Sequence, residues 1–147
     1  MGLVKSSARS SPILVDTSFL VSVYDKREHR NRQCMAALAS VHQPLATCEP
    51  VITEAMYHLR RIPRARQAIF ESVEQGILEI PFRISDTAPA VAELMVKYVD
   101  TPCDLADACL IAMANQLDTG DILTLDGDFM HYRWKRNRRF NMLIPLE

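Results

Sequence analysis

Short apolar runs alternate with segments of helical periodicity along the chain, and this alternation restricts the fold more than any other feature. The apolar runs lie at 13–15, 44–47, 77–80, 122–125 and 141–144. Between them, apolar residues recur at the spacing of amphipathic helices. Strands joined by helices pair in parallel, and the helices cover the faces of their sheet. The sequence therefore predicts an α/β fold, a three-layer α/β/α sandwich with a mainly parallel central sheet.

Length and composition indicate one domain. A chain of 147 residues with 48% hydrophobic residues can bury a core without disulfide or zinc crosslinks. The Ser-rich, polar residues 1–11 are expected to be a disordered leader, and 12–147 are expected to form a single domain. No apolar run approaches the roughly 20 residues that span a bilayer, and a signal peptide is not evident. We expect a cytoplasmic protein without a membrane partner.

The cysteines support this compartment. They show no C-x-x-C pair and no regular framework, and they stand in apolar surroundings, at Cys34, Cys48, Cys103 and Cys109. This pattern is typical of small buried side chains in a reducing environment.

The segment DLADACLIAMANQL, residues 104–117, is apolar almost all round and predicts a central, buried helix. Its aspartates are the exception. Asp104 can cap the helix, but Asp107 lies inside the apolar stretch, where an uncompensated charge is costly. Something is therefore expected to balance Asp107.

Other acidic residues are predicted to meet this pair. Asp16 follows the first apolar run and Asp126 follows the run at 122–125, so both lie at the carboxyl ends of strands. Asp104 and Asp107, three residues apart, share one face of a helical turn. Glu54 stands about one turn into the helix after the second strand, from which it can reach the same edge. The sequence predicts a convergence of carboxylates.

Crowded carboxylates repel one another and need a counter-charge, which a divalent cation provides. Oxygen ligands without His or Cys favour Mg²⁺ or Mn²⁺. Such ions activate water and stabilise charge on a phosphate undergoing hydrolysis. Nucleotide-binding glycine loops and a G-x-S-x-G elbow are absent from the sequence, and its histidines have no ligand spacing. The pattern indicates phosphodiester hydrolysis.

Each of these residues also has a purely structural interpretation. Asp16 and Asp104 are suited to cap helices, and Asp128 stands in a common turn sequence with Asp126. Glu54 alone is an ordinary solvated helix residue. Their joint placement favours the metal site.

Three stretches resemble the PIN domain, particularly the VapC-type ribonuclease toxins: ILVDTSFLVSVYD, ITEAMYHL and DLADACLIAMANQLDTGDILTLDGDF. The likeness extends from about Ile13 to Ile144, and the last stretch is the most specific. It implies metal-dependent RNA cleavage by an acidic core of Asp16, Glu54, Asp107 and Asp126. Some members also use the positions of Asp104 and Asp128 as metal ligands.

The resemblance implies further roles and partners. The hydroxyls of Ser18 and Thr124 match positions that accompany the site. Family members commonly form homodimers, and the toxins are inhibited by an antitoxin protein whose C-terminal segment blocks the cleft, often with an arginine.

The segment HYRWKRNRRF is more basic than the fold requires. We interpret it as a guide for the RNA backbone, with Trp134 or Tyr132 available to stack on bases. The proposed RNA-binding cations are Arg133, Lys135, Arg136, Arg138 and Arg139. The alternative is a solvated charged loop beside an edge strand.

The leading hypothesis is a Mg²⁺- or Mn²⁺-dependent endoribonuclease, the toxin of a toxin–antitoxin pair. A catalytically silent PIN-like module that binds RNA or protein is the alternative. A dehalogenase-like phosphatase with Asp16 as nucleophile fits poorly, because Ser18 stands where such enzymes place a second aspartate.

Overall fold

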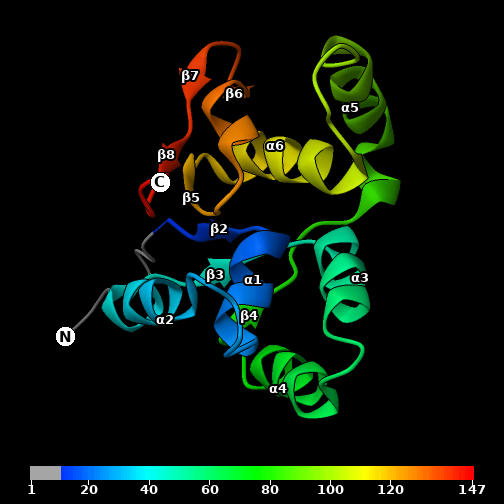
Figure 1. Cartoon of the computed structure of the whole chain (residues 1–147). Coiled ribbons are helices and arrows are strands. Elements are labelled where there is room, and N and C mark those ends of the chain that lie inside the picture. The colour runs from blue at the N-terminus through cyan, green and yellow to red at the C-terminus, as the bar shows by residue number, and fades with distance from the viewer. Residues whose placement is uncertain (1–10) are drawn as a thin grey trace, which may run out of the picture.

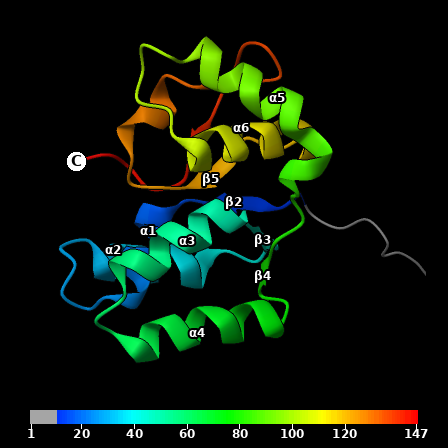
Figure 2. The same ribbon diagram turned by 90° about the vertical axis from the view of Figure 1, so that its right-hand side faces the viewer.

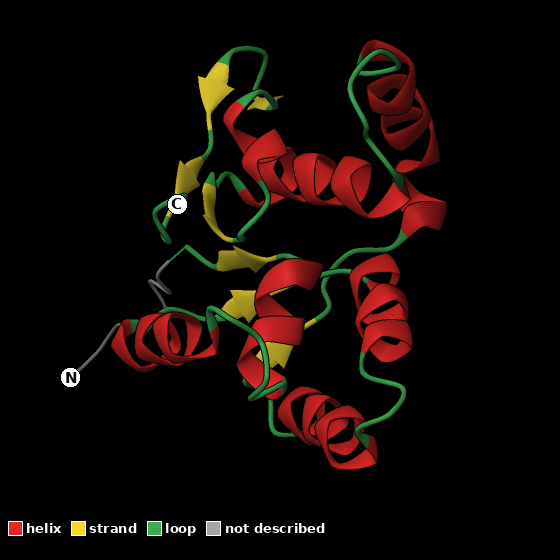
Figure 3. Ribbon diagram, in the orientation of Figure 1, coloured by secondary structure: helices red, strands yellow, loops and turns green. Residues whose placement is uncertain are grey.

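A computed structural model describes residues 11–147 and contains one five-stranded parallel sheet (Figures 1 and 3). Its strands are β2 (Ile13–Val15), β3 (Leu45–Ala46), β4 (Leu78–Glu79), β5 (Asp121–Leu123) and β8 (Asn141–Met142). They lie in the order β4-β3-β2-β5-β8, with β2 at the centre. All four neighbouring pairs are parallel. The predicted edge strand near the C-terminus is confirmed as β8.

Six helices connect these strands: α1 (Thr17–Tyr24), α2 (Asn31–Ser40), α3 (Glu49–His58), α4 (Pro63–Glu74), α5 (Ile84–Lys97) and α6 (Leu105–Leu117). Figure 2 shows α5 and α6 together on the β5 side of the molecule and α1 to α4 around β2, β3 and β4. Consecutive residues of β2 point to opposite faces, yet Ile13, Leu14 and Val15 are all buried. The sheet is therefore covered on both faces, and the predicted α/β class is confirmed.

The direction of chain progression reverses at β2. From β2 the chain moves outward through β3 to β4, and it then crosses back through α5 and α6 to β5 on the other side of β2. Right-handed crossovers in opposite directions place helices on opposite faces and leave a crevice beyond the carboxyl ends of the strands. The carboxyl ends of β2 and β5 border this crevice.

The predicted central helix is confirmed as α6. Its residues from Ala106 to Ala114 are all buried, and it packs against α5 and α3. The side chain of Asp104 caps the helix by accepting a hydrogen bond from the Asp107 amide. The helix ends at Asp118, whose φ of 56° is left-handed. Small alanine and cysteine side chains allow neighbouring elements to approach this helix closely.

A kink interrupts the start of α5. The helical segment begins at Ile84. Thr87 then breaks it with a φ of −136°. Pro89 explains the break, because a proline lacks an amide donor and is tolerated only in the first turn of the segment that restarts here.

The apolar face of α5 is narrow. Val91 is buried and Leu94 is half-buried, but Ala88 and Ala92 are exposed and Met95 is 38% exposed. Val91 and Leu94, three residues apart, are the residues of this helix that pack against the core.

The basic segment near the C-terminus is ordered. A short 3₁₀ helix, η1 (Gly127–Met130), leads into an antiparallel hairpin of β6 (Arg133–Trp134) and β7 (Arg138–Arg139). Tyr132 is fully buried and Trp134 is 7% exposed. The expectation that either ring stacks on bases is therefore wrong, because both rings complete the core instead.

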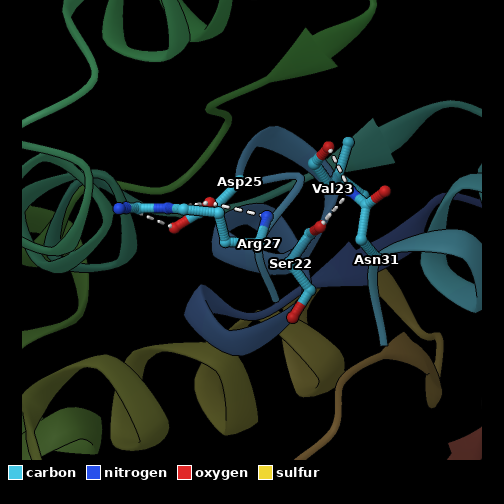
Figure 4. A network of polar contacts seen from close by, with 5 residues as sticks. All are labelled: Ser22, Val23, Asp25, Arg27 and Asn31. Carbon is cyan, nitrogen blue, oxygen red and sulfur yellow. Dashed lines mark hydrogen bonds and ion pairs between the residues drawn. The ribbon is translucent and has the colours of Figure 1, made fainter. Parts of the chain in front are cut away.

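A network at the end of α1 fixes the loop toward α2 (Figure 4). Asn31 Nδ2 donates to the carbonyls of Ser22 at 2.7 Å and Val23 at 3.1 Å, two carbonyls of the last helical turn. Arg27 binds the Asp25 carboxylate through Nε at 3.1 Å and Nη2 at 3.2 Å. These contacts satisfy the C-terminal end of α1, whose other end borders the crevice.

The predicted leader, residues 1–11, lies outside the described residues except for Ser11. Within 11–147, no helix is both long and apolar enough to cross a bilayer.

Gly120 permits the burial of Trp134 and provides a test of the core. A Cβ atom at Gly120 would lie 2.2 Å from Trp134 Nε1. Gly120→Ala is therefore expected to displace the indole and to lower the free energy of unfolding by about 2 kcal/mol, a typical cost of overpacking. Denaturant titration followed by the fluorescence of this single tryptophan measures the change.

Gly127→Ala is the matched control, because a Cβ atom there would meet Leu146 Cδ1 at an ordinary 3.7 Å. Equal stability of the two variants would contradict the close packing of Trp134 on Gly120.

Candidate functional site

Asp16 lies directly after β2 and is 4% exposed. Its Oδ1 accepts the Thr17 amide at 2.7 Å, which caps α1. Its Oδ2 accepts the Thr124 hydroxyl at 2.7 Å. The predicted cap is confirmed, and the same carboxylate also faces the crevice. The cap orients the side chain without using all of its lone pairs.

Two hydroxyl groups link Asp16 to the chain after β5. The Thr124 hydroxyl donates to Asp16 and accepts the Asp126 amide at 3.0 Å. Ser18 Oγ accepts the Leu125 amide at 2.9 Å and lies 3.4 Å from Asp16 Oδ2. Ser18 and Thr124 therefore fix the loop that carries Asp126.

Glu54 reaches the same edge from α3. Its Oε1 accepts the Thr17 hydroxyl at 2.8 Å. Sequence reasoning missed Thr17, although its place between Asp16 and Ser18 was a local signal. Through this contact, the first turn of α1 orients carboxylates on both β2 and α3.

Asp104 and Asp107 enter the crevice from the first turn of α6. Asp104 Oδ1 accepts the Asp107 amide at 2.9 Å, so its capping role is confirmed. Asp107 is 7% exposed, and its Oδ2 lies 3.1 Å from the hydroxyl of the buried Tyr132. Tyr132 also donates to the carbonyl of Pro102, which holds the loop before α6. The ring expected to contact bases thus borders Asp107.

Asp126 and Asp128 follow β5. Asp126 Oδ1 accepts the Asp128 amide at 2.9 Å, so the expected turn role belongs to Asp126. Asp128 lines a hollow of about 350 Å³ that adjoins the main cleft and is also bordered by Asp104, Asp107 and Asp126.

The acidic side chains line one cleft of about 410 Å³ at the carboxyl ends of β2 and β5. Five of the six predicted metal-binding residues border it: Asp16, Glu54, Asp104, Asp107 and Asp126. His58 and Glu28 also line this cleft and were not predicted. His58 follows Glu54 by one helical turn, a spacing that placed it on the same side of α3.

Burial and mutual repulsion disfavour the ionised forms of these carboxylates. Burial, opposed by the Thr124 and Thr17 hydrogen bonds, raises the pKa of Asp16 to about 6. Burial and the nearby charges of Asp104 and Asp16 raise the pKa of Asp107 to about 8. Burial likewise raises the pKa of Glu54 and of Asp126. When all of these carboxylates are ionised, they repel one another, and no lysine or arginine among the described residues that line the cleft compensates their charge.

The donor set suits a hard divalent ion. It consists of carboxylate and hydroxyl oxygens, the ligand types that Mg²⁺ and Mn²⁺ prefer. Within residues 11–147, no three Asp, Glu, His or Cys side chains lie close enough to enclose an ion by themselves. Mg²⁺ typically binds through one or two carboxylates and keeps several waters, so a lining of separated carboxylates fits it.

The basic segment does not border this cleft. The described lining of the cleft contains no lysine or arginine. The β6-β7 hairpin contacts the C-terminal end of α6, where Lys135 binds Asn115 and Asp118, whereas Asp104 and Asp107 lie at the N-terminal end. The cations of this segment therefore lie outside the lining of the cleft, and their role as a guide for the RNA backbone stays a prediction.

The pKa shifts predict a pH-dependent stability in the presence of EDTA. The pKa of Asp107 is raised on folding from 3.8 to about 8, so the folded state retains a proton that the unfolded chain releases. The stability that this bound proton contributes is fully present below about pH 4 and is lost as the pH rises through about 8. At about 1.4 kcal/mol per pKa unit, deprotonation of Asp107 lowers the free energy of unfolding by on the order of 2–3 kcal/mol between pH 5.5 and 8.5.

The melting temperature of Asp107→Asn is expected to fall less than that of the wild type as the pH rises across the same range. Asp100→Asn, a change at an exposed aspartate, serves as the matched control. A wild-type profile that coincides with that of Asp107→Asn would contradict the raised pKa.

Comparison with known proteins agrees with this geometry. The family model of the PIN domain matches residues 13–135. Among curated proteins, none matches the chain. Solved structures that match include Mycobacterium tuberculosis VapC20, described as a Sarcin-Ricin loop cleaving toxin, with a TM-score of 0.72 and 23% identity. The match covers 79% of this chain and 91% of VapC20, and at this identity it concerns the fold. Because the family match covers most of its length, the chain belongs to the PIN domain family.

Proposed function

We propose that this chain is a divalent-metal-dependent endoribonuclease that hydrolyses RNA phosphodiester bonds in the acidic cleft. The observation that carries the proposal is the burial of Asp16 and Asp107 in one cleft. Among the described residues that line this cleft there is no lysine or arginine. Such carboxylates need a counter-charge, and the oxygen-only donors favour Mg²⁺ or Mn²⁺. Residues 12–147 would act as one nuclease domain in the cytoplasm.

The proposed ligands are Asp16, Glu54, Asp107 and Asp126, with Asp104 and Asp128 as neighbours that bind directly or through water. A bound divalent ion supplies Lewis-acid stabilisation of charge on the phosphate and lowers the pKa of water. The chain orients its ligands through hydroxyl and amide donors. Thr124 holds Asp16 at 2.7 Å, Thr17 holds Glu54 at 2.8 Å, and the Asp128 amide holds Asp126 at 2.9 Å. Such supporting contacts fix ligand geometry.

RNA is the proposed substrate class. PIN-domain membership and the fold shared with VapC20, itself described as a Sarcin-Ricin loop cleaving toxin, support this assignment. We further propose that the chain is the toxin of a toxin–antitoxin pair and forms homodimers. Exposed apolar side chains at the end of α5, Val96 at 73% and Val99 at 75%, support a protein partner on that face.

The alternative is a catalytically silent module that binds RNA or protein. The carboxylates that line the cleft disfavour it, since a binding module gains nothing from groups whose burial raises their pKa. Cleavage and metal binding distinguish the two functions directly.

The test is cleavage of a panel of structured and single-stranded RNAs with Mn²⁺, Mg²⁺ or EDTA. Asp107→Asn is expected to lower the cleavage rate by more than about 100-fold, because loss of a group that merely supports a ligand already costs about 10- to 100-fold. Isothermal titration with Mn²⁺ should show weaker binding by the same variant, and its melting temperature should not fall.

Asp100→Asn is the control and is expected to cleave like the wild type. Undiminished cleavage by Asp107→Asn would remove the proposed role of that residue. RNA binding by wild-type protein without cleavage under any metal would instead establish the silent module.

A further inference from the structure

The β6-β7 hairpin forms a basic region outside the lining of the acidic cleft. Its turn lies at the C-terminal end of α6 (Figure 1), whereas Asp104 and Asp107 belong to the N-terminal end of this helix. Lys135 in the turn binds Asn115, and at 1.5 Å per residue Asn115 lies about 12 Å along the helix axis from Asp107. A ligand of the turn and a ligand of the carboxylates therefore occupy different places.

Positive charge is concentrated in this hairpin. Residues 133–139 contain five cations, Arg133, Lys135, Arg136, Arg138 and Arg139. Within residues 11–147, one ion pair involves these five cations. It joins Lys135 Nζ to Asp118 Oδ1 at 2.7 Å. Arg136, Arg138 and Arg139 are exposed. Their mutual repulsion is relieved when an anion with several charges binds.

The turn of the hairpin is strained, and the fold holds it in place. Lys135 and Arg136, in the three-residue loop between β6 and β7, have φ values of 42° and 73°, in the left-handed region that favours glycine. A left-handed conformation costs a non-glycine residue about 1–2 kcal/mol. The side chain of Asn115 accepts the Lys135 amide at 2.6 Å, and the Asp118 pair holds the same residue. Strain maintained by such contacts is typical of binding and catalytic sites.

The buried side chain of Trp134 contacts Arg138 and Arg139. Its indole is buried against Gly120, and its Nε1 donates to the Arg139 carbonyl at 3.1 Å. The Arg138 guanidinium lies 5.1 Å from the centre of the indole ring. A guanidinium held over an aromatic face retains its donors for a bidentate contact with phosphate. The aromatic ring thus supports a cation and is not available to stack on bases.

A groove continues the hairpin surface toward α5. It measures about 490 Å³, and it is lined by the polar residues Arg136, Asn115, Lys97 and Glu93 and by the apolar side chains of Ala90, Leu94 and Val96. Lys97 thus adds a cation from α5 on the side of the groove away from the hairpin.

We propose that the β6-β7 hairpin is a second RNA-binding site, which takes the phosphate backbone of an RNA that extends about 12 Å or more from the cleft. The chemistry favours phosphates over bases, since the aromatic rings are buried and the exposed groups are guanidiniums. It favours RNA over an acidic protein, since the exposed part of the hairpin offers charge without apolar side chains. The inference rests on the proposed ribonuclease function for the identity of the ligand.

The test measures RNA binding by fluorescence anisotropy in the cleavage-deficient Asp107→Asn background, so that binding and cleavage remain separable. The variant carries Arg136→Gln, Arg138→Gln and Arg139→Gln. For a stem-loop of about 30 nucleotides, affinity is expected to fall by at least about 10-fold at low salt. The slope of log affinity against log salt should decrease by about 2–3, because each phosphate that a cation neutralises contributes about 0.9 to this slope.

Two controls separate this site from general charge and from the cleft. The exposed cluster Arg60, Arg61 and Arg64, changed to Gln, removes the same charge elsewhere and should leave binding nearly unchanged. With Asp107 restored, the hairpin variant should still cleave a dinucleotide RNA at the wild-type rate, because its single phosphodiester cannot occupy both sites.

Equal effects of the two arginine variants, or an unchanged salt slope, would overturn the second site. Displacement of the stem-loop by polyglutamate at equal charge would also overturn it, in favour of an acidic polypeptide. If the hairpin triple variant unfolds, the single change Arg136→Gln must show a slope reduction of about 1. Stem-loop binding through the hairpin by a wild-type protein that never cleaves RNA would refute the ribonuclease and leave the binding site intact.

Discussion

The carboxylate of Asp16 lies where the central strand ends, with 4% of the residue exposed, and the other acidic groups approach it from α3, α6 and the loop after β5. Burying one carboxylate beside others is unfavourable, and the protein offsets part of this cost with amide and hydroxyl donors from Thr17 and Thr124. These donors belong to the same turns that begin α1 and end β5. The local structure at the crevice and the electrostatics of the site therefore depend on the same few contacts. No lysine or arginine among the described residues that line the cleft compensates the charge of its carboxylates.

Helix α6 connects the two charged regions of the molecule. Its N-terminal turn carries Asp104 and Asp107 into the cleft, and its C-terminal residues Asn115 and Asp118 hold the basic hairpin. Nine consecutive residues between these ends are buried, so the helix is fixed in the core, and its axis separates Asp107 from Asn115 by about 12 Å. None of the ion pairs found in the described residues joins a hairpin cation to a carboxylate of the cleft. The two charged regions are therefore distinct.

Structural and chemical roles coincide in the acidic residues. Asp16, Asp104 and Asp126 each accept a backbone amide as a cap, and each also lines the cleft. The sequence indicated the cap for Asp16 and Asp104, whereas it assigned the turn after β5 to Asp128. A capping carboxylate is held in one orientation, which is what a metal ligand also requires. The choice between cap and ligand that the sequence posed for these residues is therefore not exclusive. Tyr132 combines roles in a similar way, since it fills the core and borders Asp107.

The sequence by itself determined the parallel α/β order, the buried helix at 104–117 and the edge that carries Asp16, Asp107 and Asp126. These features follow from local periodicity and from the position of a residue directly after a strand or within a first turn. The tertiary structure alone decided that Trp134 and Tyr132 are core residues, that Met95 faces outward and that the basic hairpin lies at the far end of α6. Long-range contacts set these outcomes. The space above Gly120 and the partners at the end of α6 come from segments whose relative positions no local pattern specifies.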